Sequence, residues 1–223
     1  GKLVYDKGVS KIEHVSFKTL NNFNTDKKQV LDFKLASKAR HIRVIECVDG
    51  ELVTNEITEN ATIEYGNLVS NTTTDILKIS VVNRYKNEKP VVAFIKNFGL
   101  KEGAIASSVG HDSHNIIAVG VSDAAICQAV NLIIENKGGI CAVSDTDRKI
   151  VPLPIAGIMS DQNAETIGAQ YAQLDTMAKQ MGSQLQAPYM SLSFMALLVI
   201  PKLKLSDKGL FNGEKFEFTT LEV

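Results

Sequence analysis

Hydrophobic and polar residues alternate in short stretches through the first half of the chain, a pattern typical of β-strands. The stretches that predict strands are 32–36, 41–48, 51–65, 76–82 and 89–95. Asp49-Gly50 and the polar residues 83–88 supply turns between them. Residues 1–20 predict a thin hairpin with little core of its own, which is expected to pair with another part of a protein.

The second half of the chain changes character. Residues 115–121 form a continuous apolar run, which predicts a strand buried on both faces. A helix is expected after Ser122 as N-cap, ending near 137–139, and a second helix over about 164–181. Between them, the stretches 139–143 and 149–155 predict a strand pair. The order β-α-β-β-α, after a strand-rich first half and without an internal linker, predicts an α+β fold.

Composition narrows the class of protein. Of 223 residues, 44% are hydrophobic and 22% charged, as in soluble globular proteins. The net charge of −1 and the absence of Trp argue against a nucleic-acid or anionic-membrane partner. The longest apolar run, 190–201, is shorter than the roughly 18 residues of a spanning helix. Three separated cysteines without a signal peptide indicate the reducing cytoplasm.

The densest polar chemistry lies in SSVGHDSHN, residues 107–115, directly before the long apolar run. His111 and His114, with Asp112 between them, could bind a divalent metal if a third ligand came from elsewhere. Alternatively, Asp112 could orient a histidine for proton transfer. The segment could also be a polar turn leading into the strand, because Asp, Ser and Asn favour turns.

Other charged residues offer weaker signals. Asp75, Lys78 and Arg84 follow one another along a single segment and are interpreted as a surface ion-pair set. Residues 203–210 predict a turn at Asp207 without evident chemistry. The chain has no glycine-rich phosphate loop and no G-x-S-x-G elbow.

Four long motifs carry a family resemblance. They are DILKISVVNRY (75–85), GLKEGAIASSVGHDSHNIIAVGVSD (99–123), LPIAGIMSD (153–161) and PYMSLSFMALLVIPKLKLSDKGL (188–210). Together they resemble the C-terminal region of bacterial adenine deaminases, in the amidohydrolase superfamily. The resemblance implies that residues 1–20 are a remnant of the family's small β-sandwich and that 21–223 form its C-terminal α+β domain. Tyr85 stands where the family is expected to have histidine.

The resemblance also implies a parent enzyme that hydrolyses adenine to hypoxanthine and ammonia. Its divalent metal, manganese or iron, would activate water at the end of a (β/α)8 barrel. This chain contains no H-x-H pair, and its length leaves no room for a barrel of about 250 residues. We therefore expect no barrel and no primary metal site in this chain, and no activity from the chain alone.

Three hypotheses follow for the SSVGHDSHN segment. In the first, His111, Asp112 and His114 take part in the chemistry of the parent active site, while Ser107, Ser108 and Asn115 contact adenine. Direct metal ligation by His111 and His114 is an alternative, as is a purely structural network. In the second hypothesis the chain is an assembly module, and in the third a stand-alone metallohydrolase. The expected partners are the missing barrel, adenine and a second copy of the enzyme.

Overall fold

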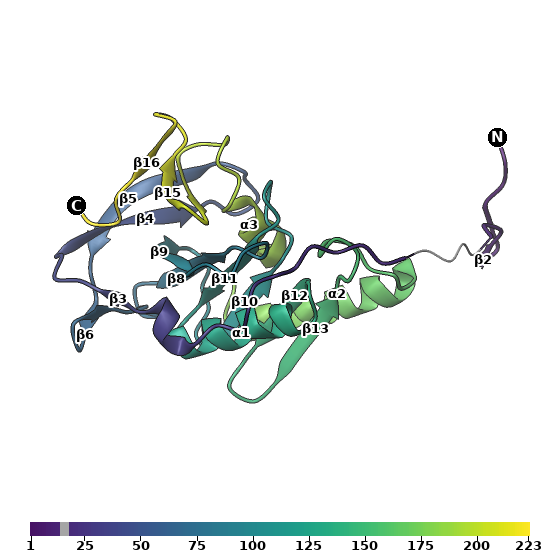
Figure 1. The fold of residues 1–223 in the computed structure, drawn as a ribbon, viewed down its shortest axis with the longest axis horizontal. Helices are drawn as coiled ribbons and strands as arrows, with labels where there is room; N and C mark the ends of the chain where they lie inside the picture. The colour runs from purple at the N-terminus through teal and green to yellow at the C-terminus, as the bar shows by residue number, and fades with distance from the viewer. Residues whose placement is uncertain (14–17) are drawn as a thin grey trace.

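The computed structural model describes residues 1–13 and 18–223 and centres on an eight-stranded sheet (Figure 1). The strand order is β13-β12-β10-β11-β8-β9-β4-β5, and neighbours are antiparallel except for β4 and β9. The strands are β4 (His41–Cys47), β5 (Thr54–Asn60), β8 (Ile76–Val82), β9 (Val91–Lys96), β10 (Ala104–Ser107), β11 (Ile116–Gly120), β12 (Gly139–Val143) and β13 (Arg148–Pro152). The sheet is open, with β13 and β5 at its edges, so the described residues form no closed barrel. The predicted α+β class is confirmed.

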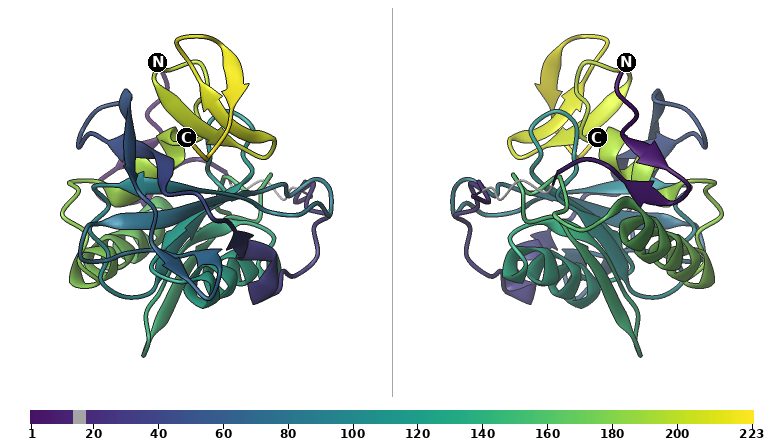
Figure 2. Two further views of the ribbon diagram at one scale, coloured as in Figure 1. Left: turned by 90° about the vertical axis from the view of Figure 1, so that its left-hand side faces the viewer. Right: turned by 90° about the vertical axis from the view of Figure 1, so that its right-hand side faces the viewer.

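Helices cover both faces of this sheet (Figure 2). Helix α1 (Asp123–Glu135) lies on one face with the 3-10 helix η1 (Val30–Phe33), while α2 (Ala164–Gln180) and α3 (Pro188–Phe194) lie on the other. A small sheet of β14 (Leu203–Ser206), β15 (Gly209–Asn212) and β16 (Glu217–Thr219) packs beside α3. No helix in the described part of the chain is long and apolar enough to cross a membrane.

Two small sheets complete the architecture. Strands β3 (Leu35–Ala36), β7 (Asn67–Leu68) and β6 (Ile63–Glu64) form a small sheet in that order. Strands β1 (Tyr5–Asp6) and β2 (Val9–Ser10) form the N-terminal hairpin, which projects from one end of the molecule (Figure 1). Residues 14–17 of the hairpin predicted over 1–20 lie outside the described residues. The division at residue 20 stays a prediction.

Strand β8 separates two hydrophobic cores. Leu77, Ile79 and Val81 pack with the side that carries α2 and α3, whereas Val82 packs with α1. Successive side chains of a strand point to opposite faces, and here both faces are covered. All seven residues of β8 are therefore buried.

Most strongly patterned elements form as predicted. Confirmed strands are those predicted at 41–48, 76–82, 89–95 and 115–121, and the pair over 139–143 and 149–155. Ser122 is the N-cap of α1, and its hydroxyl accepts a hydrogen bond from Ala125 N at 3.2 Å. The helix predicted over about 164–181 forms as α2, which buries Leu174, Met177 and Ala178.

Other segments differ from the prediction. Of the strand predicted at 32–36, only Leu35–Ala36 forms, as β3. The first part belongs to η1, because Asp32 caps the backbone N–H of Gln29 at 2.7 Å. The predicted strand at 51–65 breaks into β5 and β6. The sequence does not predict β10, because its four residues are too few to show a period. It does not predict α3 either, because the apolar residues of PYMSLSF do not lie along a single stripe. The predicted turn at Asp207 joins two unpredicted strands, β14 and β15.

The predicted surface ion-pair set is also wrong. Lys78 is 1% exposed and Arg84 is 4% exposed. Lys78 Nζ lies 2.5 Å from Asp123 Oδ1 at the start of α1 and donates to Phe33 O at 3.1 Å. Burial lowers the pKa of Lys78, and the carboxylate of Asp123 opposes that shift. The pair joins the sheet to both helical elements on this face.

Replacing Asp123 by Ala is expected to destabilise the protein by roughly 3–5 kcal/mol, because it leaves a buried charge without its partner. The matched control is Asp175→Ala, which breaks the surface pair with Lys179 at 2.6 Å and is expected to cost less than about 1 kcal/mol. Urea denaturation of both variants measures the difference. Equal free energies of unfolding would contradict the role given to the buried pair.

Candidate functional site

The candidate site is the loop of residues 108–115 between the paired strands β10 and β11. The His111 ring stacks on Phe194 of α3 at 5.0 Å between centroids and 16° between planes. The backbone N–H of His111 donates to Ser193 O at 3.1 Å. The His114 ring lies 6.0 Å from the His111 ring, so the structure brings both predicted histidines together.

The surroundings of His114 favour the neutral form of its imidazole ring. Its backbone adopts φ of 52°, and its N–H donates to Gly110 O at 2.7 Å. Burial is the main cause that lowers the pKa of His114, reinforced by His111 and Arg84 and opposed by Asp112. Its Nδ1 is buried without a hydrogen-bond partner among the described residues. Near neutral pH, His114 therefore offers an uncharged ring that can accept or donate a proton.

Ser107, Ser108 and Asn115 form the base of the loop and are all buried. The Ser108 hydroxyl donates to Gly157 O at 2.5 Å and accepts from Gly139 N at 2.8 Å. Ser107 Oγ accepts a hydrogen bond from the backbone N–H of Val109. Asn115 Oδ1 accepts one from the backbone N–H of Arg84, just after β8. These contacts hold the loop on the sheet, and the predicted contact with adenine stays a prediction.

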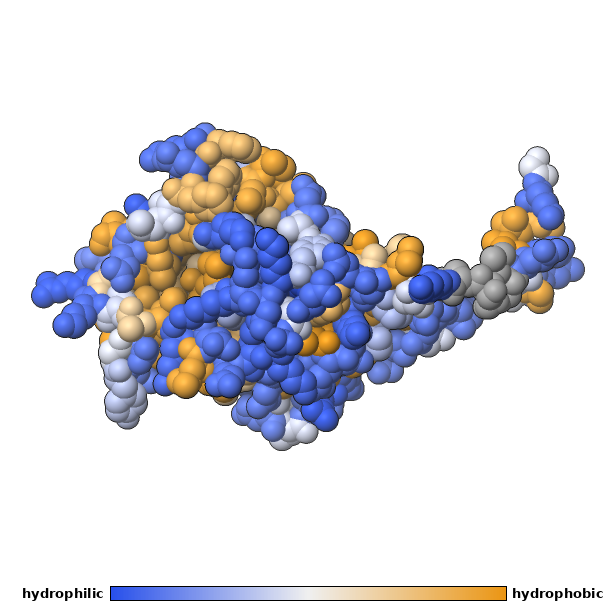
Figure 3. Space-filling model, viewed as in Figure 1, coloured by the Kyte–Doolittle hydropathy of each residue, from blue (hydrophilic) through white to orange (hydrophobic). Residues whose placement is uncertain are grey.

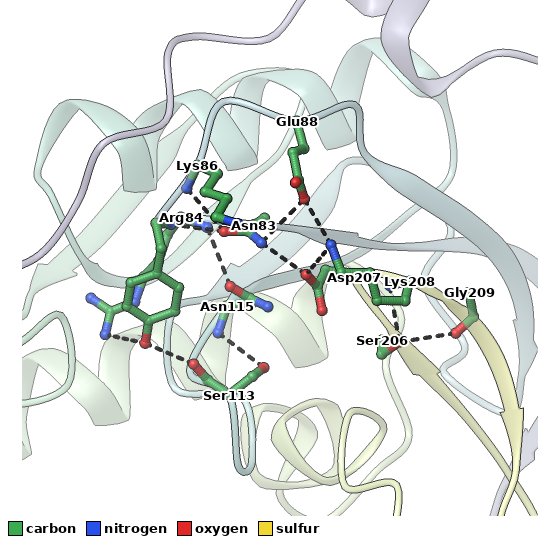
Figure 4. A network of polar contacts seen from close by, with 11 residues as sticks. Asn83, Arg84, Lys86, Glu88, Ser113, Asn115, Ser206, Asp207, Lys208 and Gly209 are labelled. Atoms are coloured by element: carbon green, nitrogen blue, oxygen red, sulfur yellow. Dashed lines mark hydrogen bonds and ion pairs between the residues drawn. The ribbon is translucent and has the colours of Figure 1, made fainter. Parts of the chain in front are cut away.

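A second segment, the turn from β8 to β9, packs against the loop (Figure 4). Tyr85 donates its hydroxyl proton to Ser113 O at 2.8 Å and accepts from Arg84 Nη2 at 3.0 Å. Asn83 Nδ2 donates to Asp207 Oδ2 at 2.8 Å, which brings in the turn between β14 and β15. Three distant segments thus meet at one place. The sequence signal for Arg84, Tyr85 and Asp207 was their presence in the resembling motifs.

The described residues do not fit a metal centre. Within 1–13 and 18–223, no group of three or more His, Cys, Asp or Glu side chains is placed to hold an ion. A pocket of about 570 Å³ lies at the opposite end of β8, beside Cys47, Asp75 and Asn97, and no residue of the loop lines it. Among the described residues, His111, Asp112 and His114 are therefore not placed to hold an ion together.

Comparison with known proteins decides the family. A sequence profile described as the adenine deaminase C-terminal domain matches residues 51–217, which include the loop and both turns beside it. The chain belongs to the adenine deaminase C-terminal domain family. Over 220 residues it is 47% identical to an adenine deaminase of Borreliella afzelii, which covers 98% of this chain and 40% of the relative.

Two further adenine deaminases show similar coverage. The one from a Sulfurovum species is 52% identical over 208 residues, covering 93% of this chain and 38% of the relative. The one from Methanosarcina barkeri is 46% identical over 230 residues, covering 99% and 42%. The chain thus spans about two-fifths of the length of the curated adenine deaminases it matches.

Replacing Ser108 by Ala is expected to destabilise the domain by about 1–3 kcal/mol, because Gly139 N–H would remain buried without its acceptor. Ser160→Ala is the control, since that hydroxyl accepts a single surface bond from Gln162 N and its loss is expected to cost within about 0.5 kcal/mol. Thermal and urea unfolding measure both changes. Unchanged stability in Ser108→Ala would show that the base of the loop is held by other contacts.

Proposed function

We propose that this chain is the C-terminal part of an enzyme that converts adenine and water to hypoxanthine and ammonia. The observation that carries the proposal is similarity at 44–52% identity, over most of the chain, to proteins named adenine deaminase. Because the chain spans about two-fifths of those relatives, the catalytic centre would be completed by the rest of a longer polypeptide.

A metal would belong to that other part. The described residues supply no ligand set, and His111 and His114 lack a third partner among them. We place the divalent ion, manganese or iron, on a (β/α)8 barrel outside this chain. When bound there, such an ion lowers the pKa of water and makes it a nucleophile at neutral pH.

The loop would form the wall of the active site contributed by this domain. Adenine presents ring nitrogens that accept hydrogen bonds and an amino group that donates them. The neutral ring of His114, with a buried Nδ1 lacking a partner in the described chain, can accept or donate. Asp112 is exposed at the tip of the loop, where it can accept from the amino group or carry a proton toward the departing ammonia.

The domain also offers a surface for assembly. Val199, Phe216 and Phe218 are 59%, 68% and 55% exposed, and Figure 3 shows hydrophobic side chains over β15 and β16. This surface supports a second candidate function, in which the domain stabilises the barrel or a homo-oligomer without taking part in the chemistry. Three free, buried cysteines support a cytoplasmic setting for either function.

In the longer enzyme, His111→Ala and Asp112→Ala are each expected to lower kcat on the order of 10²-fold or more, because they remove proton-transfer or hydrogen-bonding groups. The metal content of both variants is expected to equal that of the unaltered enzyme. His41→Ala is the control, since His41 is exposed at the start of β4. Adenine turnover and elemental analysis give the two readouts.

Normal turnover in both variants would overturn the role of the loop and favour the assembly module. Loss of metal from His111→Ala would instead assign that histidine as a ligand. Deamination of adenine by residues 1–223 alone, with added manganese, would overturn the division of labour between this chain and the barrel.

A further inference from the structure

Arg84 carries a buried positive charge without a neutralising carboxylate among the described residues. Its side chain donates from Nη1 to Asn21 Oδ1 at 3.3 Å and from Nη2 to the Tyr85 hydroxyl at 3.0 Å. The ion pairs of residues 1–13 and 18–223 do not include it. A guanidinium removed from water normally takes a carboxylate partner, since desolvation of the charge is costly. Around Arg84, neutral oxygen atoms and aromatic rings lie where a carboxylate partner would be expected.

The guanidinium is clamped in one orientation. Its central carbon lies 4.6 Å from the centroid of the Tyr85 ring and 5.7 Å from that of Phe23, both within cation–π range. Gly157 lies so close to Nη1 that a Cβ at this position would collide with it. The surroundings leave Arg84 no room to receive a ligand directly, but they fix the direction in which Nη2 donates.

The hydroxyl group of Tyr85 connects Arg84 to the loop. It accepts from Arg84 and donates to Ser113 O at 2.8 Å, midway between Asp112 and His114. Among the hydrogen bonds of the described residues, this is the only one that joins residues 112–114 to another element. His111 is held by Ser193 and Phe194, whereas this hydroxyl supplies the contact that ties the following residues of the tip to the turn after β8.

The turn that carries this hydroxyl is itself anchored. Asn83 Oδ1 accepts from the backbone N–H groups of Tyr85 and Lys86 at 2.9 and 3.0 Å. The backbone N–H of Arg84 donates to Asn115 Oδ1 at 3.2 Å, which ties the turn to the end of the loop (Figure 4). A rigid turn and a clamped guanidinium together leave the Tyr85 hydroxyl little freedom.

We propose that Tyr85 is a positioning residue of the deaminase: its hydroxyl, oriented by Arg84, holds the tip of the loop so that Asp112 and His114 face the substrate. This inference rests on the proposed function and deepens it. Tyr85 itself acts through the loop and need not touch adenine.

The test uses Tyr85→Phe in the longer enzyme, which keeps the ring over Arg84 and removes only the hydroxyl. Hydrogen–deuterium exchange of peptides covering 111–115 is expected to become faster, and kcat is expected to fall about tenfold, in line with loss of the hydrogen bond to Ser113 O. KM is expected to change less than kcat, because the groups that contact adenine remain present. Tyr65→Phe, at a fully exposed tyrosine, is the matched control and is expected to change neither readout.

Arg84→Lys provides a second variant. Lysine keeps the charge but lacks the planar fork that reaches both Asn21 and Tyr85. Its effects on exchange and kcat are expected to match those of Tyr85→Phe, and the double variant is expected to add little, as for groups that act in series. Full additivity of the two changes would overturn the proposal that Arg84 acts on the loop through Tyr85.

The outcomes separate the relay from the function on which it rests. Lost turnover in His111→Ala, with unchanged exchange and kcat in Tyr85→Phe, would overturn the relay and leave the proposed function standing. Normal turnover in both His111→Ala and Asp112→Ala, with faster exchange in Tyr85→Phe, would overturn the catalytic role proposed for the loop and leave the hold of Tyr85 on the loop standing.

Discussion

The burial of β8 on both faces is the constraint on which the rest of the structure depends. A strand covered on both sides has no route to water, so every polar group in it must find a partner inside the protein. Lys78 finds Asp123 at the start of α1, and Ser80 finds the carbonyl of Val91. Where the strand ends, Arg84 remains buried and meets the loop. Strand β8, which separates the two cores, thus also positions Arg84 beside the loop of the candidate site.

The elements that could be predicted from sequence are those whose environment is uniform along their length. In strand β8 and in helix α2, each face has the same environment along the whole element. The hydrophobic residues of each element therefore recur at the spacing of its secondary structure. Helix α3 lies between the sheet, α2 and the loop, so apolar residues surround most of it and its helical period disappears. Strand β10 is too short for any period, and it depends on β11 and β12 at either side to become a strand.

The candidate site could be predicted only in part for a similar reason. The density of polar residues around His111 is visible in the sequence, because they are neighbours along the chain. The contributions of Arg84 and Asp207 are not, because a charged residue near a turn is usually exposed. Only the packing of Phe23 and Gly157 around the guanidinium shows that Arg84 is buried. The family resemblance marked the motif that contains Tyr85 but not the contact it makes.

Contacts between the segment before η1 and Arg84 are expected to form late in the folding of the chain. Asn21 joins Arg84, 63 residues away, and Pro154 O, 133 residues away, while the backbone N–H of Asn24 donates to Arg84 O. Contacts of such sequence separation close large loops and carry a high entropic cost before they form. We therefore expect the large sheet to form before the segment that contains Asn21 and Asn24 packs against Arg84. An ordered arrangement of the two histidines would then be a property of the finished fold alone.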